Sequence, residues 1–464
     1  METANVIEMK PSHSDFISGE LEVIARRPKS ISETGLGKHF LQELVVKHLS
    51  EGGKMNLRQL SGRLSLAGPI LENILNAMRK DAWIEILGPA SDKSGLRYAL
   101  TDRGRAAAAE ALLKSGYIGP APVPLERYSQ VVRMQSVHLQ RVTKSNMQNA
   151  FADVVVDEDL MDQLGSAVHS GRAIFVYGSP GTGKTFLCQR LALLYQDAVL
   201  VPHAIVIDNT VVQVYDPSLH KPVNYLDSEP TMMLGEGFDP RFVLCERPAV
   251  VTGGELTLDM LEIQFEPSTR LFQAPLQLKA NNGIYIIDDL GRQRVAPVDL
   301  FNRWIVPMES WEDYLNLPSG KRLAVPFDVV LTFSTNLNPL ELADEAFLRR
   351  LGHKIQFHYS TPDLYTKIWQ QVCKEKDIDF NSGLLDYVIN DLHAKFKVPM
   401  LPCHPRDLLG IALDYSTYQG ITELTPEILK IAWNSYFVNL ETEASTTETA
   451  KSQSDHYQLL SKDY

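Results

Sequence analysis

Cysteine is scarce in this chain of 464 residues, which contains four, and no two of them form a Cys-x-x-Cys pair. That scarcity excludes a disulfide-stapled scaffold and a cysteine-rich zinc site. Long hydrophobic segments are also missing: no run of 18 or more apolar residues occurs, and the opening METANVIEMKPSHSDF has no apolar signal segment. We therefore expect a cytoplasmic protein with reduced thiols and no membrane span.

Positive charge is in deficit, with 45 Lys and Arg against 57 Asp and Glu and a net charge of -12. A chain this acidic is unsuited to enclosing nucleic acid over its whole surface, although a local basic domain stays open. The rest of the composition is ordinary for a globular protein, with 44% hydrophobic and 22% charged residues. This composition excludes bulk disorder, and the length predicts two or three domains.

The N-terminal part of the chain divides into two predicted segments. Residues 1–36 are polar, show no sustained period and predict a flexible arm, whereas residues 37–116 predict a winged helix-turn-helix domain. Its three helices begin near Lys38, after the N-cap Asn56 and at the first-turn Pro69. WIEILG and LRYALT supply two strands, and DRGRAAAAEALLKSG supplies a trailing helix.

Two further segments are set apart by composition. Within residues 117–140, the proline-rich YIGPAPVPLERY breaks both periods and predicts a linker between domains. Residues 441–464 are polar and poor in aliphatic side chains, so they predict a disordered tail.

The strongest motif is AIFVYGSPGTGKTFL, in which a buried strand runs into a glycine-rich loop and then into a helical pattern. Glycines let backbone N–H groups converge on phosphate oxygens, a lysine reaches the β- and γ-phosphates, and a hydroxyl binds Mg²⁺. We assign Lys184 to the phosphates and Thr185 to Mg²⁺. The predicted ATP-binding loop comprises Gly178, Ser179, Pro180, Gly181, Thr182, Gly183, Lys184 and Thr185.

A second buried strand ends in two acidic residues. In GIYIIDDLGR, four apolar residues precede Asp288 and Asp289. A carboxylate at such a strand end holds Mg²⁺, and a second one orients or activates the attacking water. We therefore assign Asp288 to the metal and Asp289 to catalysis.

The order of these motifs resembles that of the AAA+ ATPases, from about Val155 to Phe437. The resemblance implies an α/β core with the parallel sheet of P-loop NTPases at 141–360 and an α-helical lid at 361–440. It also implies ATP and Mg²⁺ as cofactors, ATP hydrolysis, and assembly of the chain with other copies of itself into a ring, a hexamer.

The same resemblance implies roles for four more residues. Asn336, in VVLTFSTNLNP, corresponds to the sensor 1 residue that hydrogen-bonds the γ-phosphate or the attacking water. Arg349 and Arg350, in DEAFLRRLGHKIQF, correspond to the arginine finger that reaches the nucleotide of a neighbouring subunit. Arg406, in CHPRDLLGIALDY, corresponds to sensor 2 in the lid.

One feature departs from the family pattern. Most members carry Asp-Glu at the metal-binding strand, whereas this chain carries Asp288-Asp289, one methylene shorter at the position that activates water. Either the water approaches differently or hydrolysis is slow.

Two hairpin patterns place the chain near one branch of the family. WIVPMESWEDYLNLPSGKRLAVPFDVV predicts a hairpin directly before the sensor 1 strand, and LEIQFEPSTRLFQAP predicts another upstream. This resembles the pre-sensor-1 hairpin branch, which includes MoxR-type chaperones, enhancer-binding activators of transcription and minichromosome-maintenance helicases. Because both hairpins face the central channel in that branch, residues 267–270 and 319–322 are the expected working surface. The long segment 205–247 contains a further hairpin pattern, HAIVIDNTVVQVYDP, and has no assigned role.

Three functions remain open at this point. The first is an ATPase that remodels a protein client, the second a DNA-associated motor or transcription regulator that uses the winged helix, and the third a nucleotide-gated scaffold with slow hydrolysis. Residues 38–114 hold 12 Lys and Arg against 8 Asp and Glu, which favours DNA contact. The would-be recognition helix nevertheless has Leu71, Glu72 and Asn73 in its leading turns and its basic residues at the far end, which favours protein docking.

Overall fold

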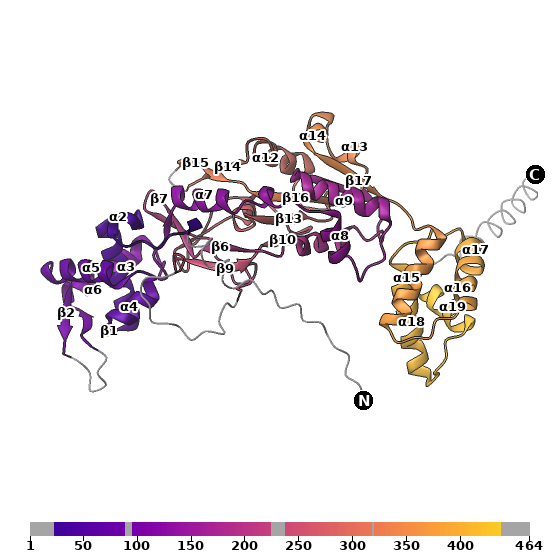
Figure 1. Cartoon of the computed structure of the whole chain (residues 1–464), viewed down its shortest axis with the longest axis horizontal. Coiled ribbons are helices and arrows are strands. Elements are labelled where there is room, and N and C mark those ends of the chain that lie inside the picture. The colour runs from indigo at the N-terminus through magenta and orange to yellow at the C-terminus, as the bar shows by residue number, and fades with distance from the viewer. Residues whose placement is uncertain (1–22, 89–94, 224–236, 318–319, 438–464) are drawn as a thin grey trace, which may run out of the picture.

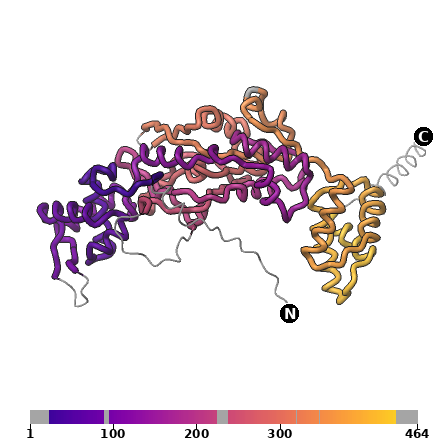
Figure 2. The backbone as a smooth tube through the Cα atoms, in the orientation of Figure 1, coloured from indigo at the N-terminus to yellow at the C-terminus, as the bar shows by residue number. Residues whose placement is uncertain are grey.

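The computed structural model describes residues 23–88, 95–223, 237–317 and 320–437 (Figure 1). An N-terminal domain, a central body and a C-terminal helical lid follow one another along the long axis, as the backbone trace in Figure 2 also shows. Most of the predicted arm and the whole predicted tail lie outside the described residues.

The N-terminal domain contains the helices and strands that the sequence predicts for it. Asn56 caps its second helix through a capping box with Gln59, and Pro69 lies in the first turn of its third helix. A short additional strand completes an antiparallel sheet of order β1-β3-β2. The elements are α3 (Lys38–Gly52), β1 (Met55–Asn56), α4 (Leu57–Leu64), α5 (Gly68–Lys80), β2 (Ile84–Leu87), β3 (Arg97–Leu100) and α6 (Asp102–Lys114).

The central sheet confirms the predicted α/β fold class, since it is wholly parallel with the order β10-β13-β16-β5-β17. Its three inner strands, β13, β16 and β5, are buried on both faces for most of their length, which is why they read as nearly continuous apolar runs. Ile174 and Val176 pack toward the layer of α8, α9 and α10, whereas Phe175 joins the opposite layer around α12 and α14. The elements are α8 (Lys144–Ala150), α9 (Glu158–Ser170), β5 (Ile174–Gly178), α10 (Lys184–Arg190), β10 (Ala249–Thr252), β13 (Gly283–Ile287), α12 (Pro297–Ser310), β16 (Val329–Thr335), α14 (Glu345–Arg350) and β17 (His353–Phe357).

A β-rich region lies between the N-terminal domain and the central sheet (Figure 1). It contains a five-stranded sheet of order β11-β12-β8-β7-β4 and two strand pairs, β6-β9 and β14-β15, which share one buried core. The predicted hairpin in HAIVIDNTVVQVYDP is confirmed as β7-β8, with Asp208 and Asn209 at positive φ in its two-residue turn. The strands are β4 (Val123–Pro124), β6 (Ala198–Pro202), β7 (Ala204–Ile207), β8 (Thr210–Gln213), β9 (Phe242–Glu246), β11 (Gln264–Glu266), β12 (Leu271–Gln273), β14 (Glu312–Asn316) and β15 (Arg322–Pro326).

The segment 117–140 is not the linker that the sequence predicted, because it is folded into this β-rich region. Strand β4 pairs with β7, and α7 (Leu125–Met134) buries Tyr128, Val131 and Val132 in the shared core. The prolines that suggested a linker all precede α7. The helix itself carries apolar residues three and four positions apart, which is the spacing of a buried helical face.

The last part of the predicted arm is also ordered. Ala25 is fully buried, and α2 (Ile31–Thr34) leads into the N-terminal domain. Arg241, only 2% exposed, forms an ion pair with Asp239 at 2.8 Å and donates to the Thr34 carbonyl at 2.9 Å. Because a buried guanidinium needs an acceptor for each N–H group, these bonds hold α2 against the β-rich region.

The two predicted insert hairpins are present as β11-β12 and β14-β15, but neither is a free protrusion. At the tip of β11-β12, the Arg270 carbonyl accepts a hydrogen bond from the Gly116 N–H at 3.1 Å, so this tip contacts the N-terminal domain. In β14-β15, Leu315 and Val325 are buried in the core of the β-rich region, and Lys321 forms an ion pair with Asp208 of the β7-β8 turn. Residues 318–319 at that tip lie outside the described residues.

The lid is a bundle of helices with its own hydrophobic core, to which Tyr365, Trp369 and Trp433 contribute fully or almost fully buried side chains. Among the described residues, no helix is both long and apolar enough to cross a membrane. The lid elements are α15 (Pro362–Glu375), α16 (Ser382–Asp386), η4 (Tyr387–His393), α17 (Ala394–Phe396), α18 (His404–Gln419) and α19 (Pro426–Tyr436).

The contact between Gly116 and the β11-β12 tip predicts a steric effect. A Cβ atom on Gly116 would lie 1.7 Å from the Thr269 carbonyl oxygen, so Gly116→Ala must separate the tip from the N-terminal domain. We expect the free energy of unfolding to fall by about 1–3 kcal/mol, as for other overpacked sites, measured by urea denaturation. As the control, Gly62→Ala in α4 meets no atom within 4 Å and should be neutral or stabilising by up to about 1 kcal/mol. Equal stability of the two variants would contradict the docking.

Candidate nucleotide site

The glycine-rich loop follows β5 at the carboxyl end of the central sheet. Gly178, Gly181 and Gly183 all have positive φ, at 146°, 82° and 86°. Residues that have a Cβ adopt such backbone angles only with strain. A Cβ on Gly178 would also lie 2.3 Å from the Phe357 carbonyl oxygen of the adjacent strand. These glycines allow the loop to fold tightly and to expose its backbone N–H groups.

Lys184 is the first residue of α10, and its ammonium group lies under the loop. Its Nζ donates to the carbonyl oxygens of Gly178 and Ser179 at 2.9 Å each, and to Asn336 Oδ1 at 2.7 Å. Burial lowers the pKa of Lys184 from its ordinary value, and the negative charges of Asp288 and Asp289 partly oppose this shift. The ammonium is therefore positioned in the loop before any phosphate binds.

Three strand ends meet at this point. Asp288 and Asp289 follow β13, and Asn336 follows β16, the strand between β13 and β5. Asn336 Nδ2 donates to Asp289 Oδ1 at 2.9 Å, so the Asn336 amide bridges Lys184 and Asp289. The neighbouring Thr335 is fully buried and donates to the Leu290 carbonyl, which makes it a structural residue of the sheet.

A cavity of about 930 Å³ adjoins the loop, and it is lined by Lys184, Thr185, Asp288, Asp289 and Asn336 together with parts of the lid. Within the described residues, neither the Thr185 hydroxyl nor the Asp288 carboxylate makes a hydrogen bond or ion pair. Hydroxyl and carboxylate oxygens are the ligands that Mg²⁺ prefers. The two side chains therefore fit a magnesium ion, and the loop above them fits the phosphates of a nucleotide.

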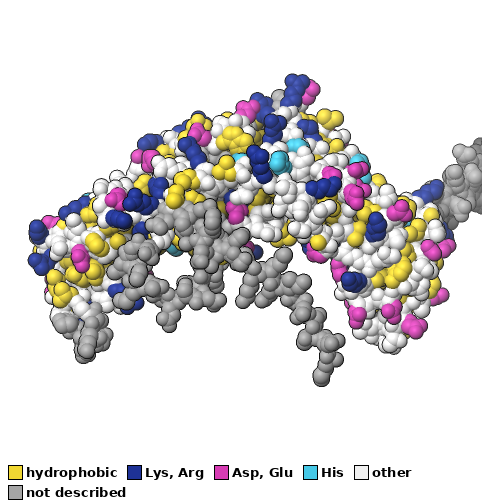
Figure 3. Space-filling view, viewed as in Figure 1, with side chains coloured by type: hydrophobic (Ala, Val, Ile, Leu, Met, Phe, Trp, Pro, Cys, Tyr) yellow, Lys and Arg dark blue, Asp and Glu magenta, His cyan; other side chains and the backbone are white. Residues whose placement is uncertain are grey.

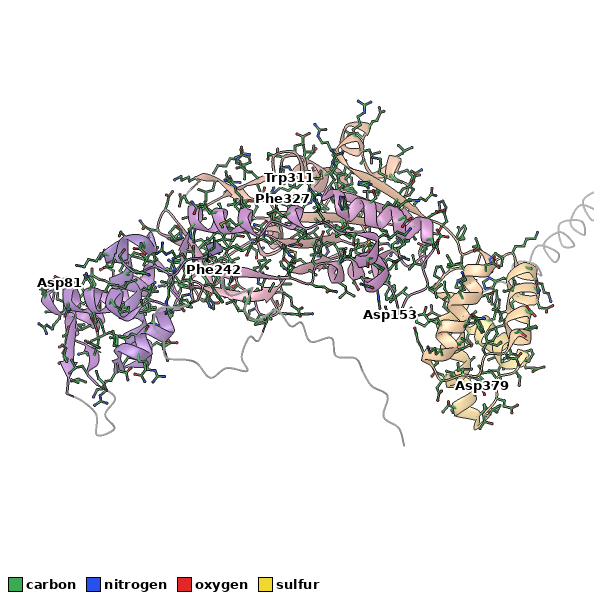
Figure 4. All side chains as sticks on the ribbon, in the orientation of Figure 1. Asp81, Asp153, Phe242, Trp311, Phe327 and Asp379 are labelled. Atoms are coloured by element: carbon green, nitrogen blue, oxygen red, sulfur yellow. The ribbon has the colours of Figure 1, made fainter. Side chains whose placement is uncertain are left out.

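The arginines suggested by the sequence lie in two different places. Arg406, on α18, lines the cavity of the loop; its side chain is 69% exposed and pairs with Asp407 at 3.2 Å. Arg349 and Arg350 do not line that cavity but a separate one of about 520 Å³, whose lining includes Trp311 and Phe327, labelled in Figure 4. The structure thus brings Arg406 to the loop of its own chain and holds Arg349 and Arg350 apart from it.

Sequence reasoning missed several contacts that the lid, and the segment leading into it, make with the core. The Tyr359 hydroxyl, just after β17, lies 3.0 Å from Ser179 Oγ, and a Cβ on Gly181 would lie 2.8 Å from Cys403 Sγ. Gln371 of α15 hydrogen-bonds the backbone on both sides of Val154. No local pattern marks these residues, since their partners lie about 180 to 220 positions away in the chain.

Comparisons with known proteins give weak similarities. A family model described as a domain of unknown function (DUF8689) matches residues 361–435. No curated protein matches the sequence. The chain is similar to a solved point mutant of RuvB from Thermotoga maritima at 12% identity, with 62% of this chain and 72% of RuvB covered and a TM-score of 0.38.

Two other solved structures are similar to a comparable degree. For NtrX from Brucella abortus the identity is 13%, with 65% of this chain and 60% of NtrX covered and a TM-score of 0.40. For domain III of the replication initiation protein DnaA from Thermotoga maritima the identity is 13%, with coverage of 63% and 97% and a TM-score of 0.34. The fold class rests on the strand order and on the loop after β5.

The contacts of Lys184 predict how its loss affects binding. Lys184→Ala removes the ammonium group from the phosphate loop, and charge-assisted hydrogen bonds are worth about 1.5–3 kcal/mol each. We expect ATP affinity, measured by calorimetry with Mg²⁺, to fall by about 100-fold or more. Asp289→Asn should bind ATP with nearly unchanged affinity and lose turnover. Equal ATP affinity of the wild type and Lys184→Ala would contradict the assignment of this loop as the nucleotide site.

Proposed function

We propose that the protein is an ATPase that binds ATP with Mg²⁺ and hydrolyses it. The observation that carries this proposal is the joining of Lys184, Asn336 and Asp289 by hydrogen bonds, beside the Thr185 and Asp288 side-chain oxygens, which have no partner in the part of the chain that the structure describes. A cation for the phosphates, two metal ligands and an oriented carboxylate are the parts that phosphoryl transfer to water requires.

Each of these side chains has a separate role in the proposed reaction. Lys184 would exchange its loop carbonyls for phosphate oxygens and neutralise their charge. Thr185 and Asp288 would hold Mg²⁺, which would supply further charge neutralisation. Asn336 keeps the Asp289 carboxylate aimed at the cavity, where it accepts a proton from the attacking water. Because Asp289 has positive φ and a short side chain, its reach depends on this bond. Slow hydrolysis, as in a nucleotide-gated scaffold, would follow if that reach is too short.

A ring of identical subunits, a hexamer, completes the proposal. Arg349 and Arg350 do not line the nucleotide cavity of their own chain, so a contact between them and a nucleotide would have to be made in the site of a neighbouring subunit. Arg349 is 74% exposed and pairs with Glu345 within one turn of α14, and Arg350 pairs with Glu309 at 2.5 Å. Exposed ion pairs of this kind are weak and exchangeable, which would let a guanidinium turn to a phosphate across an interface.

A shared site predicts complementation between two inactive variants. Arg350→Ala subunits should bind ATP and fail to hydrolyse it, while Lys184→Ala subunits lack binding but keep the arginine. Mixed rings should regain part of the wild-type ATPase rate, measured by phosphate release. Glu309→Ala, which removes one ion-pair partner of Arg350 but keeps the arginine, serves as the control and should stay active. A monomer that hydrolyses ATP at the wild-type rate after loss of both arginines would contradict the shared site.

We further propose that the ATPase remodels a protein client, in the manner of MoxR-type chaperones. The support is the direct contact between the N-terminal domain and the insert hairpin β11-β12, because a domain that contacts this insert can pass nucleotide-dependent motion to a bound partner. The hairpin tips pack against other parts of the same chain, so the client-binding role moves from the tips to the N-terminal domain.

Direct DNA contact is the alternative, favoured by basic side chains on the N-terminal domain. Figure 3 shows Lys and Arg side chains at the outer end of this domain. On α5, Arg79 and Lys80 are exposed at the end of the helix, Glu72 and Asn73 are exposed at its start, and Leu71 is fully buried, so it cannot read bases. The leading turn of α5 therefore presents an acid to any phosphate backbone, which favours protein over DNA.

Duplex DNA binding separates the two functions. In the full-length protein, replacing Arg79 and Lys80 by Ala should change the affinity for a short DNA duplex by less than about 2-fold at physiological salt. The reason is that these two side chains can contribute phosphate contacts only if DNA lies on α5, which the protein-client function does not require. Replacing Lys367 and Lys374 on α15 of the lid removes equal charge as the control. A loss of about 10-fold or more confined to the α5 variant would favour the DNA function.

A further inference from the structure

The nucleotide cavity has an apolar part beyond its phosphate loop. Val155, Val156 and Leu160 line it from the central body, and Leu364 and Ile368 line it from α15 of the lid. A flat apolar ring system attached to a sugar and phosphates fits between two such walls. In this part of the cavity, the hydrogen bonds that a ligand can form depend on the backbone N–H and C=O groups of residues 153–155.

Those polar groups are already occupied by one side chain of the lid. Gln371 Oε1 accepts from the Val155 N–H at 3.1 Å, and Gln371 Nε2 donates to the Asp153 carbonyl at 2.6 Å. Gln371 Nε2 also donates to Glu375 Oε1 at 2.6 Å, within α15. A carboxamide offers a donor and an acceptor side by side, as the edge of a nucleobase does.

The backbone that Gln371 contacts is held in place independently. The Asp153 carboxylate receives two hydrogen bonds of 2.5 Å from Arg190, whose guanidinium also donates to the Ala150 carbonyl at 3.0 Å. Figure 4 shows Asp153 at the end of the central body that faces the lid. The backbone donor and acceptor of residues 153–155 are therefore supported from the core by Arg190, and Gln371 contacts them from the lid.

We propose that Gln371 is a clasp between lid and core that occupies the hydrogen-bonding position of the nucleotide base and is released when the base enters. This proposal rests on ATP binding at the loop. Since the base and Gln371 compete for the same N–H and C=O groups, base binding detaches this part of α15 from the core, and an attached α15 weakens base binding by the same factor. Inorganic phosphates have no donor and acceptor side by side that could replace the Gln371 carboxamide, so we expect phosphates alone to leave the clasp closed.

The test compares ATP with inorganic tripolyphosphate, which carries the phosphates without a base. In full-length Gln371→Ala, measured by calorimetry with Mg²⁺, ATP affinity should rise about 5-fold, the equivalent of one ordinary hydrogen bond, and tripolyphosphate affinity should stay unchanged. Gln371→Met keeps the length of the side chain without either hydrogen bond and should behave alike. Gln370→Ala, at an exposed neighbouring position on α15, is the matched control and should change neither affinity.

Three outcomes would overturn the clasp. ATP affinity that is unchanged or reduced in both Gln371 variants would show that Gln371 does not compete with the base. A parallel rise for tripolyphosphate would show that lid opening, rather than base access, governs binding. Absence of ATP binding in the wild type and in Gln370→Ala would overturn the nucleotide function itself together with the clasp, whereas the first two outcomes leave that function intact.

Discussion

The candidate site depends on one side-chain amide, that of Asn336, which bridges the Lys184 ammonium and the Asp289 carboxylate. Without this bridge, the Lys184 ammonium at the start of α10 and the Asp289 carboxylate after β13 would be free to pair directly, and neither would be available to a ligand. The bridging amide keeps the ammonium and the carboxylate near each other without a direct ion pair, so each can still bind a ligand. It also ties together the ends of β5, β13 and β16, which hold the three groups.

The β-rich region extends this arrangement toward the N-terminal domain. Asp289 and Asn336 follow the carboxyl ends of β13 and β16. The β14-β15 hairpin directly precedes β16 in the chain and so lies at its amino end. That hairpin shares a core with β7-β8, and β12 of the second hairpin pairs with β8. A change at the nucleotide therefore has a continuous path of packed side chains and paired strands to Gly116. Such contiguity permits coupling between the candidate nucleotide site and the N-terminal domain.

The lid approaches the cavity at two places with different chemistry. At the glycine-rich loop, Cys403 of the lid packs against Gly181, and Tyr359, in the segment that leads into the lid, contacts Ser179. At the far end, Gln371 makes directional hydrogen bonds to the core backbone. A ligand with two chemically distinct ends can act on the two contacts separately, which is the physical basis for a lid that responds to a whole nucleotide and not to phosphate alone.

The sequence by itself determined the parts whose chemistry is local. Local sequence patterns predict three parts of the site: the loop from Gly178 to Thr185, the acids after β13 and the polar end of β16. The acids and the polar end can be recognised because a buried strand is apolar and stops where charged or polar residues begin. The loop can be recognised because its glycines allow the backbone to approach phosphates. Tertiary structure alone decided that 117–140 belongs to a core, that the β11-β12 tip is docked on the N-terminal domain and that Gln371 reaches residues 153–155. Those features depend on contacts between distant segments, and hydrophobic periodicity reports only that a face is buried, never which partner buries it.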